Sequence, residues 1–170
     1  MYSLHGRNKE TNMKKSKKKR RKKEGLRSKI EHSSVRMQQR LKSDGKKIVM
    51  NPEGELKMSE VLLKFVEPLL EFNKEDDNFK TIIGISIAAW NLSLLPEDRQ
   101  EEAKKEFIEG FVNLVPEVYD ASVQIVEMLI ERKKTEFADI KRFIKDYEIV
   151  NTEYGPRINV ASTLSKYPNG

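Results

Sequence analysis

The sequence predicts a mainly α fold, in which a disordered basic arm precedes a compact bundle of about five helices with short flanking β-hairpins. Three observations support this prediction. Basic residues are concentrated near the N-terminus, apolar residues recur at helical spacing further along the chain, and Pro or Gly residues interrupt that spacing at short intervals. We therefore expect a basic arm over residues 1–47 and a helical domain with short terminal β-ribbons over residues 48–170.

The arm and the domain differ in charge. Residues 1–47 contain 18 Lys or Arg and 4 Asp or Glu, a charge of +14, whereas residues 48–170 contain 15 and 23, a charge of −8. Within the arm, residues 14–23 read KKSKKKRRKK, with nine basic residues in ten. Such a block of like charges repels itself too strongly to fold alone, so we expect the arm to be disordered. Any helix after Glu24 would then be induced by a partner.

Ordered structure is expected to begin near Ile48. The sequence Asn51-Pro52-Glu53-Gly54 lies between two short apolar stretches and favours a turn, because Pro fixes φ and Gly accepts a positive φ. A first β-hairpin is therefore predicted over residues 48–58.

The next two helices contain most of the apolar residues. Ser59 is the expected N-cap of the first, in which Pro68 should introduce a kink or a short break. The second ends near Leu94 and has apolar residues nearly all round it, so we expect it to lie at the centre of the bundle, with Trp90 in the core. Gly84 in this helix should let a neighbouring helix approach closely.

Three further helices and a β-hairpin are predicted after these. Pro96 and Pro116 should open the third and fourth helices, because Pro is tolerated in a first turn. The spacing of the apolar residues predicts a fifth helix from Phe137 to Tyr147. Finally, Tyr154-Gly155-Pro156-Arg157 lies between two stretches with β-branched residues, which indicates a hairpin.

The basic block of the arm has the clearest chemical implication in the sequence. Dense Lys and Arg neutralise phosphates and release counterions, so this block is expected to bind RNA or DNA without sequence recognition. Tyr2 is the only aromatic residue of the arm, which therefore lacks platforms for base stacking. The predicted nucleic-acid-binding residues are Lys14, Lys15, Lys17, Lys18, Lys19, Arg20, Arg21, Lys22 and Lys23.

Other roles for the arm remain open. It could be a solubilising or targeting tail, including a nuclear-localisation-like patch, whereas membrane contact is disfavoured because no lipid anchor or inserting amphipathic face accompanies the charge. The acidic domain could also attract the arm, which would favour a helical protein-interaction module with a basic solubility or targeting tail. Tyr154 and Arg157, at the hairpin turn, are the predicted partner contacts.

Catalysis finds little support in the sequence. There is no Cys, and His5 and His32 both lie in the arm, so the domain lacks the usual bases, nucleophiles and soft metal ligands. Its acidic clusters are explained as helix caps and helix-surface ion pairs. Glycine-rich phosphate loops and nucleophile-elbow motifs are missing. We therefore predict no enzyme, no cofactor and no metal site.

The apolar stretches are too short to span a bilayer. The most apolar one, residues 82–95, has 14 residues, where roughly 20 are needed. Without a secretory signal or a Cys for a disulfide, we expect an intracellular, cytoplasmic location. The function predicted is a non-enzymatic accessory protein associated with nucleic acid or the ribosome, which binds phosphates through residues 14–23 and another protein through its helical domain. No motif resembles that of a known family.

Overall fold

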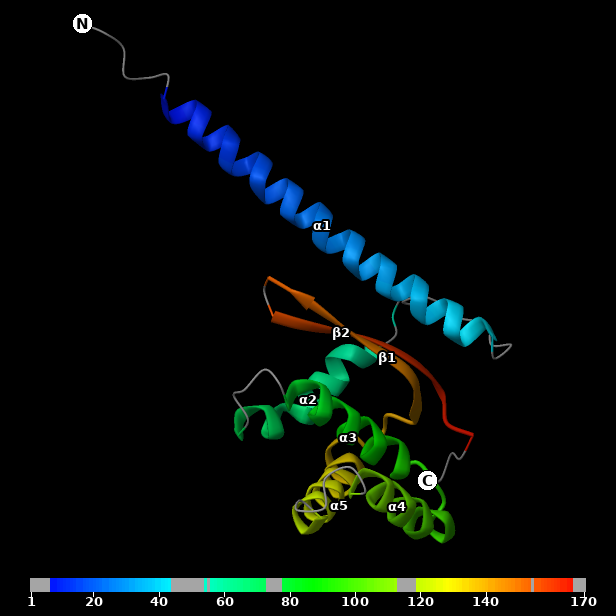
Figure 1. Ribbon diagram of the computed structural model, residues 1–170. Coiled ribbons are helices and arrows are strands. Elements are labelled where there is room, and N and C mark those ends of the chain that lie inside the picture. Colours follow the sequence, from blue (N-terminus) through cyan, green and yellow to red (C-terminus); the bar gives the residue numbers. More distant parts are fainter. Residues whose placement is uncertain are drawn as a thin grey trace, which may run out of the picture. The chain divides into compact units, whose positions relative to one another are not determined.

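The computed structural model describes residues 7–43, 54, 56–72, 78–112, 119–153 and 155–166 (Figure 1). Within these ranges five helices and two strands follow one another: α1 (Arg7–Ser43), α2 (Met58–Phe72), α3 (Phe79–Leu92), α4 (Glu97–Val112), α5 (Tyr119–Glu136), β1 (Arg142–Thr152) and β2 (Gly155–Leu164). The two strands form one antiparallel hairpin. The prediction of a mainly α fold is confirmed; of the five helices, four lie in the predicted helical domain and α1 lies in the arm.

The chain divides into two compact units. Unit 1 comprises Met1–Ile48 and Glu148–Asn159, and unit 2 comprises Val49–Tyr147 and Val160–Gly170. We call residues 148–159 the hairpin tip; it belongs to unit 1 with α1. The remaining strand residues, the hairpin base, belong to unit 2 with α2 to α5. Nothing in the sequence indicated that residues 148–159 would group with the basic arm.

Helix α2 begins close to where the sequence predicts a helix. The backbone amides of Glu60 and Val61 donate to the carbonyl of Lys57 at 2.9 and 3.2 Å, so Ser59 lies inside the first turn instead of capping it. The helix continues through Pro68 without the break that the sequence allowed. Its fully or nearly fully buried residues are Met58, Val61, Leu62, Phe65 and Val66.

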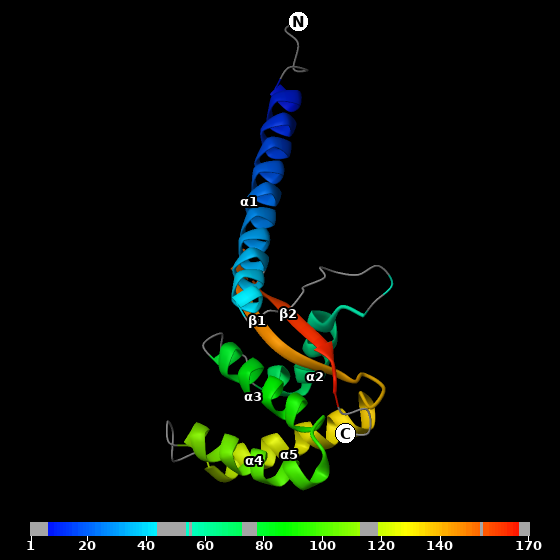
Figure 2. The same cartoon turned by 90° about the vertical axis from the view of Figure 1, so that its right-hand side faces the viewer.

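Helix α3 lies at the centre of unit 2, as predicted. It packs against α2, α4 and α5, and Figures 1 and 2 both show it beside these helices. Ile83 and Trp90 have no exposed surface, which confirms Trp90 as a core residue. A Cβ atom on Gly84 would lie 3.6 Å from the hydroxyl of Tyr147, so the close neighbour of this glycine is a strand residue and not the predicted helix.

Helices α4 and α5 complete the helical layer. The carbonyl of Pro96 accepts hydrogen bonds from the amides of Arg99 and Gln100, both at 3.0 Å, which starts α4 directly after the proline as expected. Pro116 lies outside the described residues. The buried side of α5 repeats at intervals of three and four residues and consists of Ser122, Val126, Leu129, Ile130 and Lys133.

The predicted fifth helix, from Phe137 to Tyr147, is wrong. Residues 142–152 form strand β1, and only Phe137 to Lys141 separate α5 from it. The helical spacing of the apolar residues misled the prediction, because a strand of β-branched and aromatic residues pairs here with β2. The C-terminal hairpin is confirmed, with β1 longer than expected.

Two further predictions concern the first 58 residues. The first hairpin, over residues 48–58, falls mostly outside the described residues; Gly54 has the positive φ (81°) expected of its turn, and Leu56 and Lys57 are irregular. Residues 7–43 of the arm, expected to be disordered, form α1. Lys and Arg are good helix formers, and the later part of α1 has a buried side that the charge argument did not consider.

Candidate nucleic-acid interface

The C-terminal half of α1 is docked within unit 1 by one buried stripe. Ser33, Met37 and Leu41 follow one another at intervals of four residues and are 0%, 6% and 7% exposed. Residues four apart share one side of a helix, so these side chains form a continuous contact surface. Val150 and Ile158 of the hairpin tip are also buried.

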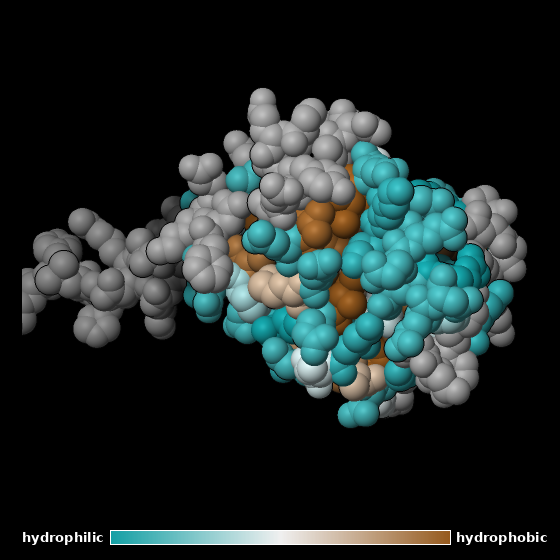
Figure 3. All heavy atoms as spheres, turned by 90° about the horizontal axis from the view of Figure 1, so that it is seen from below, coloured by the Kyte–Doolittle hydropathy of each residue, from teal (hydrophilic) through white to brown (hydrophobic). Residues whose placement is uncertain are grey.

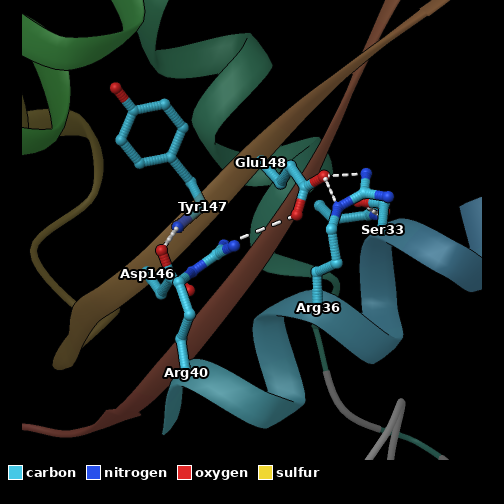
Figure 4. A network of polar contacts seen from close by, with 7 residues as sticks. Ser33, Arg36, Arg40, Asp146, Tyr147 and Glu148 are labelled. Atoms are coloured by element: carbon cyan, nitrogen blue, oxygen red, sulfur yellow. Dashed lines mark hydrogen bonds and ion pairs between the residues drawn. The ribbon is translucent and has the colours of Figure 1, made fainter.

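Next to Ser33, charged side chains of α1 contact a carboxylate of the hairpin tip (Figure 4). Arg36 Nε donates to Glu148 Oε1 at 2.9 Å, its Nη2 contacts the same oxygen, and Arg40 Nη2 lies 3.5 Å from Glu148 Oε2. The Glu148 side chain is only 16% exposed. The side-chain amide of Asn159 donates a hydrogen bond to the Ser33 hydroxyl at 2.8 Å. Two arginines of α1 are thus engaged by one carboxylate of the hairpin tip.

The basic block of α1 lies further toward the N-terminus. Side chains are described for four of the nine predicted residues, Lys18, Lys19, Arg20 and Lys22, and all four are exposed. Arg20 pairs with Glu24 at 3.1 Å, and Lys22 pairs with Glu153 of the hairpin tip.

The other five predicted residues have only a backbone assignment. Lys14, Lys15, Lys17, Arg21 and Lys23 lie in α1, but their side chains are outside the described part of the structure. The block is therefore helical along its whole length, whereas the sequence predicted disorder there.

Between residues 18 and 29 of α1, four exposed cations have no acidic partner among the described residues. Two of them, Lys18 and Lys19, were predicted from the sequence. The other two, Arg27 and Lys29, were missed because they lie outside the dense block. The run of charge available to a ligand therefore extends as far as Lys29, whereas Arg36 and Arg40 are engaged by Glu148.

Only one of the two predicted partner contacts at the hairpin turn belongs to the described residues. Tyr154 lies outside the described residues, and Arg157 is exposed on β2. The turn is closed by Thr152, whose hydroxyl donates to the carbonyl of Gly155 at 2.7 Å, and Gly155 has φ of 99°. Glycine adopts such a positive φ at little cost, which explains why a glycine occupies this position of the turn.

Among the described residues, the core of unit 2 contains one charged side chain that was not identified from the sequence as buried. Lys133 is 2% exposed, and its Nζ donates to the carbonyl of Phe137 at 2.9 Å and lies 4.7 Å from the centre of the Trp90 ring. Burial, and next the charge of Lys141, lower the pKa of Lys133 to about 8. The interval of four residues from Leu129 was a usable signal, because it places Lys133 on the buried side of α5.

Lys133 is nevertheless explained by the packing around it. Phe65, Trp90 and Phe137 form a cluster with ring centres 5.1 to 5.9 Å apart and edge-to-face geometry. The ammonium covers one ring of this cluster and satisfies a backbone carbonyl, which are favourable interactions for a buried lysine. We assign it a structural role.

Unit 2 also presents apolar surface. Figure 3 shows one face on which apolar residues form a narrow band bordered by hydrophilic ones. Among the exposed large apolar residues of unit 2 are Leu63 (37%) and Met128 (45%). These exposed side chains are apolar, unlike the cations of the basic block.

The described residues contain neither a metal-binding cluster nor a helix that could span a membrane. Among these residues, no group of three or more His, Cys, Asp and Glu side chains is arranged to hold a metal ion. None of the helices, as far as they are described, has both the length and the apolar character needed to cross a membrane. His32 is exposed on α1.

Comparisons were made with protein-family models, curated proteins and solved structures. Because no family model, no curated protein and no solved structure matches this chain, its function has to be argued from the geometry of α1 and the two units.

Proposed function

We propose that this protein is a non-enzymatic accessory protein that binds nucleic acid, free or within the ribosome, through the phosphates that contact the basic block of α1. The observation that carries the proposal is the run of exposed Lys18, Lys19, Arg20 and Lys22 on a continuous helix. A cation-rich helix of this kind neutralises phosphates and gains free energy from the release of their counterions.

The distribution of acidic residues supports the same site. Among the described contacts of the basic block, carboxylates reach only Arg20 and Lys22. Lys18, Lys19, Arg27 and Lys29 are exposed and make no ion pair with a described residue, so phosphates would bind to them without first displacing a carboxylate. Residues 48–170, with a charge of −8, would repel nucleic acid and leave α1 as the point of attachment.

The test is a salt titration of RNA and DNA binding by the full chain. In a first variant four lysines or arginines of α1 are neutralised. Each phosphate that is no longer neutralised should reduce the magnitude of the slope of log K against log salt by about 0.9, so we expect a reduction of roughly 2 to 4. The substitutions are Lys18→Gln, Lys19→Gln, Arg27→Gln and Lys29→Gln.

A matched control separates a local site from net charge. The control variant also loses four positive charges, but from exposed lysines of unit 2, and should bind nearly as the original chain does. The proposal would be contradicted if the slope of log K against log salt decreased equally in the two variants. It would also be contradicted if the original chain did not bind at about 0.15 M salt. The control substitutions are Lys57→Gln, Lys64→Gln, Lys80→Gln and Lys105→Gln.

The alternative is a helical protein-interaction module in which the arm serves only for solubility or targeting. The apolar band on unit 2 favours it (Figure 3). Under this alternative, the α1 variant would keep its protein partner, and Met128→Asp would lose it. Nucleic-acid binding would then be weak and equally affected by both charge variants.

A further inference from the structure

We propose that the nucleic acid bound by α1 is double-stranded DNA, with the basic part of the helix lying in the major groove. This inference rests on the proposed function and specifies its ligand. It follows from three properties of α1: its continuity, the distribution of charge around it, and the position where the run of available charge ends.

The first property is the size of the helix. Helix α1 contains 37 consecutive helical residues, and at about 1.5 Å per residue it is roughly 55 Å long. With side chains an α-helix is about 10–12 Å across, and the major groove of B-form DNA is about 12 Å wide. The major groove of A-form RNA is deep and narrow and does not admit side chains in this way.

The second property is that charge surrounds the helix. Successive residues of an α-helix are rotated by about 100°, so the exposed side chains of Lys18, Lys19 and Arg20 extend in three different directions. A flat surface or a single strand would contact only one of these directions. A groove has a phosphate backbone along each wall, so it presents phosphates to opposite sides of the helix at once.

The composition of α1 also argues against a single strand. Residues 7–43 include no Phe, Trp or Tyr. Binding of single strands relies on stacking of bases on aromatic side chains. Charge contacts in a groove need no such residues.

The third property limits the bound segment. The cations that continue the basic block reach Lys29, and within them a phosphate would have to displace Glu153 from Lys22. Beyond Lys29, Arg36 and Arg40 contact Glu148, and Ser33, Met37 and Leu41 are buried, so only Lys42 adds an exposed cation there without a described acidic partner. The segment 14–29 would span about 24 Å, less than the roughly 34 Å of one DNA turn. A straight helix of this length lies in the groove of an unbent duplex.

The experiment measures the affinity of the full chain for three ligands by fluorescence anisotropy at about 0.15 M salt. They are a 20-base-pair DNA duplex, an RNA duplex of the same sequence, and one DNA strand. We expect the DNA duplex to bind at least about tenfold more tightly than either of the others. An RNA duplex or a single strand that binds as tightly as the DNA duplex overturns this inference but leaves the proposed function intact. Binding to none of the three rejects the proposed function itself.

A pair of variants at one uncharged residue tests the dependence on the helix. Ser16→Pro interrupts α1 within the basic block and leaves its charge unchanged, whereas Ser16→Ala keeps the helix. We expect Ser16→Pro to lose most of the preference for duplex DNA, with its single-strand affinity within about twofold of the original, and Ser16→Ala to retain the preference. Circular dichroism verifies the loss of helix. An unchanged duplex preference in Ser16→Pro overturns the inference.

Discussion

The two units hold parts of one β-hairpin by different means. In unit 1 the contacts between α1 and the hairpin tip include ion pairs at the surface, centred on Glu148 with Arg36 and Arg40. In unit 2 the hairpin base is held by hydrogen bonds from α3: Trp90 Nε1 donates to the carbonyl of Arg142 at 2.7 Å, and the Asn91 side chain makes two bonds of 2.9 Å with the backbone of Ile144.

This difference determines how each unit responds to its surroundings. Salt screens exposed ion pairs, and phosphates can compete for their arginines and lysines. Hydrogen bonds that join a buried indole or a partly buried amide to the backbone are screened much less, and leaving one partner unsatisfied is costly. We therefore expect the contacts of the hairpin tip in unit 1 to weaken with salt more than those of the hairpin base in unit 2.

The strongest test of this comparison removes the indole at the centre of unit 2. Trp90→Ala deletes a side chain with no exposed surface, its hydrogen bond to Arg142 and its packing against Phe65 and Phe137. We expect the free energy of unfolding to fall by about 3–5 kcal/mol, measured by urea denaturation followed by circular dichroism. Met128→Ala is the control. Because Met128 is 45% exposed, this substitution should lower the free energy of unfolding much less. A decrease below about 1 kcal/mol in Trp90→Ala would show that unit 2 is not held by its aromatic core.

A smaller effect is expected from pH, through Lys133. Its ammonium loses a proton near pH 8 in the folded chain and near the ordinary pKa of 10.5 in the unfolded chain. Between these values the unfolded state binds the additional proton, so stability rises with pH. From about pH 7.5 to 10, the free energy of unfolding should increase by about 1–3 kcal/mol relative to that of Lys133→Met, which lacks the titrating group. Parallel pH profiles for the two proteins would contradict the role of burial in lowering this pKa.

The smallest effect is expected in unit 1. Glu148→Gln removes the carboxylate charge that engages Arg36 and Arg40 and should destabilise the docked half of α1 by about 0.5–1 kcal/mol at about 0.05 M salt. Amide hydrogen exchange of residues 33–41 should become a few-fold faster at low salt, and the difference should nearly disappear at about 0.5 M. Glu31→Gln removes the same charge from an exposed position of α1 and should leave exchange unchanged. If Glu148→Gln leaves the exchange of residues 33–41 unchanged at low salt, the buried stripe holds this helix without a contribution from the ion pairs.

The sequence predicted the helices of unit 2 well, because their apolar residues recur with the period of a helix. This spacing places them on one side of each helix, where they are buried. Helix α3 was even placed correctly at the centre, since apolar residues surround it. The same reasoning failed for residues 137–147, where a period close to that of a helix occurs by coincidence in a strand. A strand is favoured over a helix here by the pairing of β1 with β2 and by the hydrogen bonds that the Trp90 and Asn91 side chains make with the backbone of β1.

The candidate site was predictable in part. The basic block is evident from composition, and Lys18, Lys19, Arg20 and Lys22 are exposed as expected. Its helical backbone was not expected, because repulsion between like charges argued for disorder, and Arg27 and Lys29 were overlooked. The engagement of Arg36 and Arg40 by Glu148 was beyond sequence reasoning, because these residues are more than 100 positions apart.

By itself, the sequence determined the mainly helical character of the chain, the core position of Trp90 and the concentration of positive charge near the N-terminus. These properties depend on composition and short-range periodicity, which are local. The tertiary structure decided that the hairpin tip belongs with α1, that Lys133 is buried, and which basic residues stay available to a ligand. Those outcomes depend on contacts between segments far apart in the chain, whose free energy has no local signature.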